Sequence, residues 1–151
     1  MDNPISRIEF ISVADSIFTK ELKIYGYKFV PDPKIYDEPT NIWYVNHNKA
    51  DNMNRIIDIH TVGYDIDVVY EMAVNLCRWT TLWGTNDKTH YPRQFNFVRL
   101  APFIWDNEGS SDQWWHFRDK EELEKNCLDA LEKIINYGIP FLSDPDSKSP
   151  Y

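Results

Sequence analysis

Hydrophobic positions near the N-terminus recur with the period of an α-helix. Beginning at Ser6, apolar residues fall on one side of a helix, and serine, threonine and lysine residues fall on the other. Ser6 and Glu9 have the spacing of a capping box, and Ile5 and Phe10 have that of a hydrophobic staple. Gly26 follows as a C-terminal stop, so the pattern predicts a helix from Ser6 to the residue before Gly26. Its apolar face consists of Phe10, Ile11, Val13, Ala14, Ile17, Phe18, Leu22, Ile24 and Tyr25.

A second helical pattern lies near the C-terminus. Asp119 and Glu122 are typical of a helix start, and Gly138 followed by Pro140 is typical of a helix end. The pattern predicts a helix over about 120–137 that packs one face against a sheet. The residues of that face are Leu123, Cys127, Ala130, Leu131, Ile134 and Tyr137.

Between the two predicted helices, short runs rich in β-branched and aromatic residues alternate with turn residues. They lie at 27–30, 41–45, 54–61, from 66 onward, and at about 93–101. The run from Ile66 to Leu76 has an apolar residue at every second position, although Val68, Met72 and Leu76 also fit a helix. A strand is favoured, because the preceding Gly63–Asp65 has the chemistry of a hairpin turn.

These elements predict an α+β fold. We expect an antiparallel meander of about five strands, with an N-terminal and a C-terminal helix packed on it. A chain of 151 residues, 42% of them hydrophobic, suits one core. We therefore expect a single domain over 1–142, followed by a polar, proline-punctuated tail over 143–151.

The net charge limits the possible partners, and the N-terminal residues indicate the location of the protein. The net charge of −8 disfavours binding to nucleic acid or to an anionic membrane, and it suits a basic protein partner. The N-terminus lacks the basic and apolar segments of a secretory signal, so we expect a cytoplasmic protein. No apolar run approaches the ~18 residues of a membrane span.

Common cofactor and catalytic motifs do not occur in the chain. There is no phosphate-binding loop, dinucleotide-binding glycine motif, zinc-protease H-E-x-x-H or nucleophile-elbow G-x-S-x-G. Cys77 and Cys127 lack the spacing of a cysteine zinc site or a disulfide framework. We expect no cofactor and no bound metal, and the sequence points to no catalytic residue.

Polar residues on the predicted strands are candidates for a binding site. Asp58 and His60 lie two residues apart, so they share one face of a strand. A metal would need a further ligand, for which Glu71 across the hairpin is a candidate, but cross-strand pairing of His60 with a carboxylate explains the same residues. Arg99 is a candidate partner on the last predicted strand. If His60, Glu71 and Arg99 converged in a cleft, they would favour an enzyme.

Aromatic residues form the most unusual segment. Trp114 and Trp115 precede the C-terminal helix and would point to opposite faces of an extended chain. One face of this segment would be core, filling the space between sheet and helix. The other would be exposed, where a tryptophan beside an arginine either stacks on a planar ligand or forms an interface hot spot.

The order of features resembles an uncharacterised bacterial family called domain of unknown function four-three-zero-four. The resemblance rests on Gly26-Tyr27-Lys28, on Asn41-Ile42-Trp43-Tyr44 and on the strand pair 56–60 and 68–76. It also rests on Phe97-Val98-Arg99-Leu100, on Trp114-Trp115 and on the closing segment 137–142, so it covers nearly the whole chain. Related chains often carry Gln at the position of His60, and this chain has extra residues around 79–92. The resemblance implies the fold and the strand over 66–76, and it implies no activity.

Three classes of function remain open. The first is a noncatalytic binding or protein-interaction domain, of which a toxin-neutralising immunity protein is one version; the missing catalytic motifs favour this class. The second is a small hydrolase-like enzyme with a site on the sheet face. The third is a structural or oligomerising role, which a self-complementary hydrophobic face would support.

Overall fold

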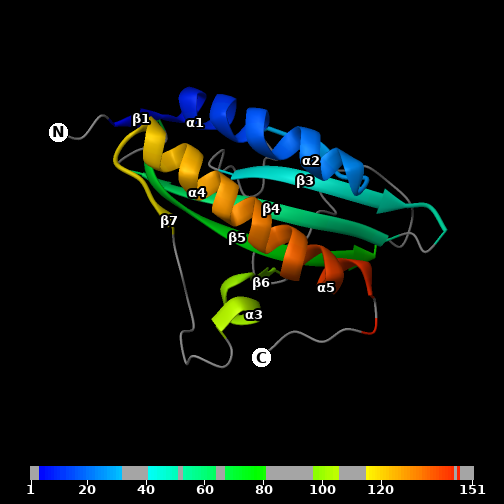
Figure 1. The fold of residues 1–151 in the computed structure, drawn as a ribbon. Helices are drawn as coiled ribbons and strands as arrows, with labels where there is room; N and C mark the ends of the chain where they lie inside the picture. Colours follow the sequence, from blue (N-terminus) through cyan, green and yellow to red (C-terminus); the bar gives the residue numbers. More distant parts are fainter. Residues whose placement is uncertain are drawn as a thin grey trace.

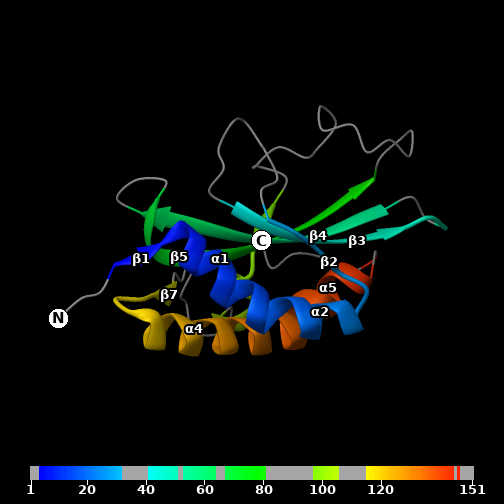
Figure 2. The same ribbon diagram turned by 90° about the horizontal axis from the view of Figure 1, so that it is seen from above.

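A computed structural model describes residues 4–31, 41–50, 53–63, 67–80, 97–105, 115–144 and 146. It has two layers. Within these residues seven strands form one antiparallel sheet in the order β1-β5-β4-β3-β2, and β6 and β7 also pair with β5. Helices α1, α2, α4 and α5 cover one face of the sheet (Figure 1), and a view from above places them all on the same side (Figure 2). The predicted α+β fold is confirmed.

The strands differ greatly in length. The central ones are β3 (Asn41–Asn48), β4 (Met53–Gly63) and β5 (Val68–Thr80). The shorter ones are β1 (Ile5–Ser6), β2 (Lys28–Val30), β6 (Val98–Arg99) and β7 (Trp115–His116). One edge of β5 pairs with β4, while its other edge pairs in succession with β1, β7 and β6. Short segments from three parts of the chain therefore cover one long edge.

The strand interpretation of the run that ends at Leu76 is confirmed, since residues 68–76 of the run belong to β5. Of the strand expected over about 93–101, the described part forms only Val98–Arg99. A short helix that the pattern did not predict, α3 (Ala101–Trp105), follows it. Residues 64 and 65 of the expected hairpin turn lie outside the described residues, and Gly63 belongs to β4.

The first helix begins and ends as predicted. It consists of α1 (Arg7–Ala14), a wider π-helical turn η1 (Asp15–Thr19) and α2 (Lys20–Ile24). Ser6 Oγ accepts a hydrogen bond from the backbone N–H of Glu9 at 3.1 Å. Gly26 has a φ of 89°, a left-handed conformation that favours glycine. The apolar face is shorter than expected, because Ile24 and Tyr25 are exposed.

The last helix is longer than predicted. Asp119 Oδ1 caps it by accepting from the backbone N–H of Glu122 at 2.9 Å, so the predicted start is confirmed. The predicted end is wrong: α4 (Lys120–Lys133) continues through a π-helical turn η5 (Ile134–Gly138) into α5 (Ile139–Ser143). Gly138 keeps right-handed helical angles. A Cβ atom there would lie 3.2 Å from Leu76 Cδ2 of the sheet, so Gly138 permits a close approach and does not terminate the helix.

The core lies between the helices and the sheet. Phe10, Phe18 and Leu22 of the first helix are fully buried against Tyr44 and Ile57 of the central strands, among other residues. Both cysteine thiols are free and buried, and burial raises the pKa of each to about 12. They are therefore unreactive as nucleophiles at neutral pH.

No helix in the described part of the chain is long and apolar enough to cross a membrane.

Candidate functional site

A row of polar residues crosses the sheet face that points away from the helices. Ile57 and Ile59 belong to the core beneath the helices, so Asp58, which lies between them in β4, points to the opposite face. The register places Asp58 opposite Trp43 of β3 and Asn75 of β5. Asn75 in turn lies opposite Arg99 of β6. Four strands thus contribute one residue each to this row.

Asp58 is the centre of the row, and the residue is only 3% exposed. Its Oδ1 accepts hydrogen bonds from Asn41 Nδ2 at 2.8 Å and Trp43 Nε1 at 2.9 Å, and its Oδ2 accepts from Asn75 Nδ2 at 2.9 Å. Burial raises the pKa of Asp58 to about 6, although the three donors and the Arg99 charge oppose this effect. Asp58 is therefore ionised at neutral pH, and its carboxylate ties three strands together.

His60 joins this network through Asn41. Its Nδ1 lies 2.7 Å from Asn41 Oδ1. Because the amide nitrogen of Asn41 donates to Asp58, the amide oxygen faces His60, and Nδ1 of His60 must be the donor. In the neutral ring the proton acceptor is then Nε2. This arrangement can orient a histidine for proton transfer or for ligand binding.

The structure does not join Glu71 to His60. Glu71 Oε2 lies 2.9 Å from Nδ1 of His116 on β7, a partner that the sequence did not predict. His60 Nδ1 lies beside the amide oxygen of Asn41. Arg99 stands beside Asn75 in the polar row, where its charge lowers the pKa of Asp58. Among the described residues, no group of three or more His, Cys, Asp and Glu side chains is arranged to hold a metal ion.

The aromatic segment before the last helix contributes to the core. Trp115 is buried and donates its Nε1–H to Asp129 Oδ2 of α4 at 2.9 Å, which holds β7 against the helix. Phe117 is also buried and stacks on Phe10 of α1, with ring centroids 6.0 Å apart and an interplanar angle of 17°. Trp114 lies outside the described residues. Trp115 therefore has the role of a core residue that links two elements.

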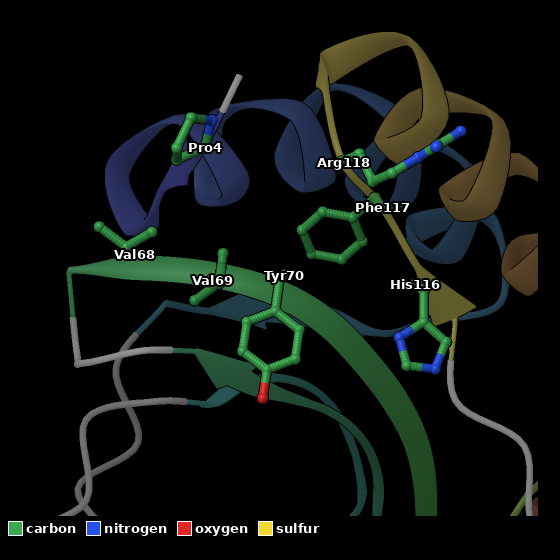
Figure 3. A pocket seen from close by; sticks show the side chains of 7 residues that line it. All are labelled: Pro4, Val68, Val69, Tyr70, His116, Phe117 and Arg118. Carbon is green, nitrogen blue, oxygen red and sulfur yellow. The ribbon is translucent and has the colours of Figure 1, made fainter. Parts of the chain in front are cut away.

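A pocket of about 190 Å³ opens beside this segment (Figure 3). Residues 68–70 of β5 line one side, His116, Phe117 and Arg118 line the other, and Pro4 completes the wall. The pocket lies where the edge of β5 passes from its pairing with β1 to its pairing with β7. Most of the lining is apolar, and the side chains of Tyr70, His116 and Arg118 carry polar groups.

Both basic residues of the pocket are held by an acid. His116 pairs with Glu71, as described above, and Arg118 Nη2 lies 2.6 Å from Glu122 Oε1. Hydrogen bonds from Arg118 keep the pKa of Glu122 below its usual value. The sequence indicated that residues 114–117 are unusual, but it did not predict the pocket. Pro4 and Val68 are more than 40 residues away along the chain, and no local pattern marks them.

A comparison of the chain with protein-family models, with curated proteins and with solved structures found no match.

Proposed function

We propose that this chain is a noncatalytic protein-interaction domain and that its partner inserts one side chain into the pocket beside β7. The volume of the pocket carries the proposal. Sites for cofactors and drug-sized ligands enclose roughly 300–1,000 Å³, whereas this pocket of about 190 Å³ suits a single aromatic or branched side chain. Interfaces commonly depend on such an apolar anchor in a well-packed pocket.

The bonding of the polar row supports a structural role for it. Both carboxylate oxygens of Asp58 are occupied by donors from neighbouring strands. A buried carboxylate in such a network stabilises one register of the sheet, because any slip would leave it without donors. The most polar residues of the sheet face thus have a role that does not require a substrate.

The nature of the partner follows from charge. A net charge of −8 attracts a basic protein over long range and repels nucleic acid. A basic toxin is one such partner, which would make the chain an immunity-type protein. The similarity to domain of unknown function four-three-zero-four, a bacterial origin and a cytoplasmic location are parts of the same proposal.

The pocket can be tested by blocking it. Val68→Arg places a long cationic side chain at the pocket wall, and Leu128→Arg makes the same change at an exposed position on α4. A partner isolated with the wild-type protein should then be purified and titrated by calorimetry. We expect Val68→Arg to weaken its binding at least tenfold and Leu128→Arg to leave it unchanged. Equal binding by both variants would remove the pocket from the interface. Pro4→Trp, at an exposed position, blocks the same pocket without altering β5.

The hydrolase alternative is favoured by one observation, the oriented ring of His60 with Nε2 as its proton acceptor. A second histidine provides a matched control, because His47 Nδ1 also lies 2.8 Å from an asparagine oxygen, that of Asn54, at an exposed site. An enzyme that uses His60 would lose esterase or peptidase turnover in His60→Gln and keep it in His47→Gln. No turnover above background in the wild-type protein would eliminate this alternative.

A further inference from the structure

Three of the seven residues that line the pocket beside β7 carry aromatic rings, namely Tyr70, His116 and Phe117. Figure 3 shows the Tyr70 ring on the β5 side of the pocket, the His116 ring on the β7 side and the Phe117 ring between them. The remaining wall is formed by Pro4, the two valines of β5 and Arg118. A side chain inserted here would therefore meet aromatic rings on more than one side.

Contacts outside the pocket hold two of these rings in place. Phe117 is buried and stacks on Phe10, as described above. The His116 ring is held by Glu71, and the backbone carbonyl of His116 accepts a hydrogen bond from Asn126 Nδ2 of α4. The His116 side chain is nevertheless 70% exposed, so a bound group can contact its ring. Because these rings are already fixed, binding has a lower entropic cost.

The charged groups around the pocket are already engaged with one another. His116 pairs with Glu71 and Arg118 pairs with Glu122, and neither acid lines the pocket. A charged side chain would have to compete with these pairs, and it would also lose hydration against the apolar part of the lining. An uncharged side chain avoids both costs.

From the aromatic lining and the engaged charges we infer that the partner's anchor is an uncharged aromatic side chain, that of phenylalanine, tyrosine or tryptophan. The inference rests on the proposed protein-interaction function and narrows it, because a branched aliphatic side chain could fill the same volume. Aromatic rings whose centroids lie roughly 4.5–7 Å apart, offset or edge to face, gain binding free energy beyond the apolar area that they bury. Tryptophan and tyrosine are also enriched among the residues that dominate interface energetics.

Two matched compounds separate ring chemistry from hydrophobic volume. They are the acetylated amides of phenylalanine and cyclohexylalanine, titrated into the intact ¹⁵N-labelled protein and followed through the amide resonances of residues 68–70 and 116–118. We expect the phenylalanine amide to bind roughly 2- to 12-fold more tightly, the range for an aromatic pair. The ring current of phenylalanine should also shift the ring-proton resonances of His116 more than the cyclohexyl compound does. The acetylated amides of lysine and glutamate should cause no saturable shift.

The possible failures differ. Equal affinity for the two compounds, or tighter binding of the cyclohexylalanine amide, would overturn the aromatic inference and leave an apolar anchor, and hence the proposed function, in place. If neither compound shifted the pocket resonances, the pocket would not be a binding site, and both proposals would fall. Saturable binding of the lysine or glutamate amide at the same resonances would contradict an uncharged anchor.

A pair of variants tests the contribution of the His116 ring. His116→Leu replaces the ring with an aliphatic side chain at an exposed position, so it should lower the ratio of the two affinities at least twofold. His47→Leu makes the same change at an exposed position of β3 and should leave both affinities unchanged. An unaltered ratio in His116→Leu would contradict the part that this ring has in the preference.

Discussion

Arg55 of β4 and Arg78 of β5 lie directly opposite each other in the sheet, and both donate to carbonyl groups at the end of α5. Arg55 Nε donates to Leu142 O at 2.8 Å, and Arg78 Nη1 donates to the carbonyls of Phe141 and Asp144. Like charges on facing strand positions repel. The partial negative charge of the helix C-terminus offsets this repulsion, so the two arginines and α5 stabilise one another.

We expect Arg55→Met to lower the free energy of unfolding by about 2 kcal/mol, because a buried carbonyl loses a charged donor. Arg78→Met should cost about 1 kcal/mol, since Arg78 is only half-buried. Urea denaturation monitored by circular dichroism measures both. Lys28→Met at an exposed position of β2 is the control and should stay within about 0.5 kcal/mol of the wild type. If Arg55→Met were as stable as the wild type, the repulsion between the two arginines would offset the stabilisation from the hydrogen bonds to the carbonyl groups.

Asp58 should make the protein less stable as the pH rises, whereas most carboxylates have the opposite effect. Its pKa rises from 3.8 in the unfolded chain to about 6 in the fold, so between these values the folded state binds more protons. Stability from this group is therefore present below about pH 4 and is lost as the pH rises through 6. Between pH 4 and pH 7 the free energy of unfolding of the wild type should fall by on the order of 3 kcal/mol relative to that of Asp58→Asn. Parallel urea titrations of the two proteins measure the difference, and a difference that did not vary with pH would contradict it.

Gly138 should resist replacement even though it lies in a helix. Alanine normally gains up to about 1 kcal/mol over glycine inside a helix. Here its Cβ would press on Leu76, which is fully buried among other core residues. We expect Gly138→Ala to destabilise the protein by about 1 kcal/mol net, as overpacking outweighs propensity. In a Leu76→Val background the same change should cost less. A stabilising Gly138→Ala change would show that the helix and sheet can separate locally.

Trp115 should contribute to stability, as a core residue does. Trp115→Phe keeps an aromatic ring but removes the donor to Asp129, and we expect a loss of about 1 kcal/mol. Trp115→Ala should cost about 3–5 kcal/mol because it leaves a cavity. The change Asp129→Asn should add little on top of Trp115→Phe, since the donor to residue 129 is already missing there. An alanine variant as stable as the wild type would instead indicate an exposed side chain.

Much of the candidate site could not be predicted from the chain alone. Asp58 and His60 lie on one face because side chains alternate along a strand with a period of two residues. Asn41 and Asn75, which hold the Asp58 carboxylate, come from other strands and become its partners only through the register. The Glu71 carboxylate pairs with His116 because β7 covers the far edge of β5, a pairing that no nearby residue signals.

The sequence by itself determined where both helices begin, where the first one ends and which segments form the central strands. These features depend on neighbouring residues, such as the side chain of Ser6 or Asp119 and the backbone freedom of Gly26. Only the tertiary structure decided that the last helix continues past Gly138, that Trp115 is core and that a pocket forms beside β7. Each of these depends on contacts between distant parts of the chain, whose packing outweighs the local signals.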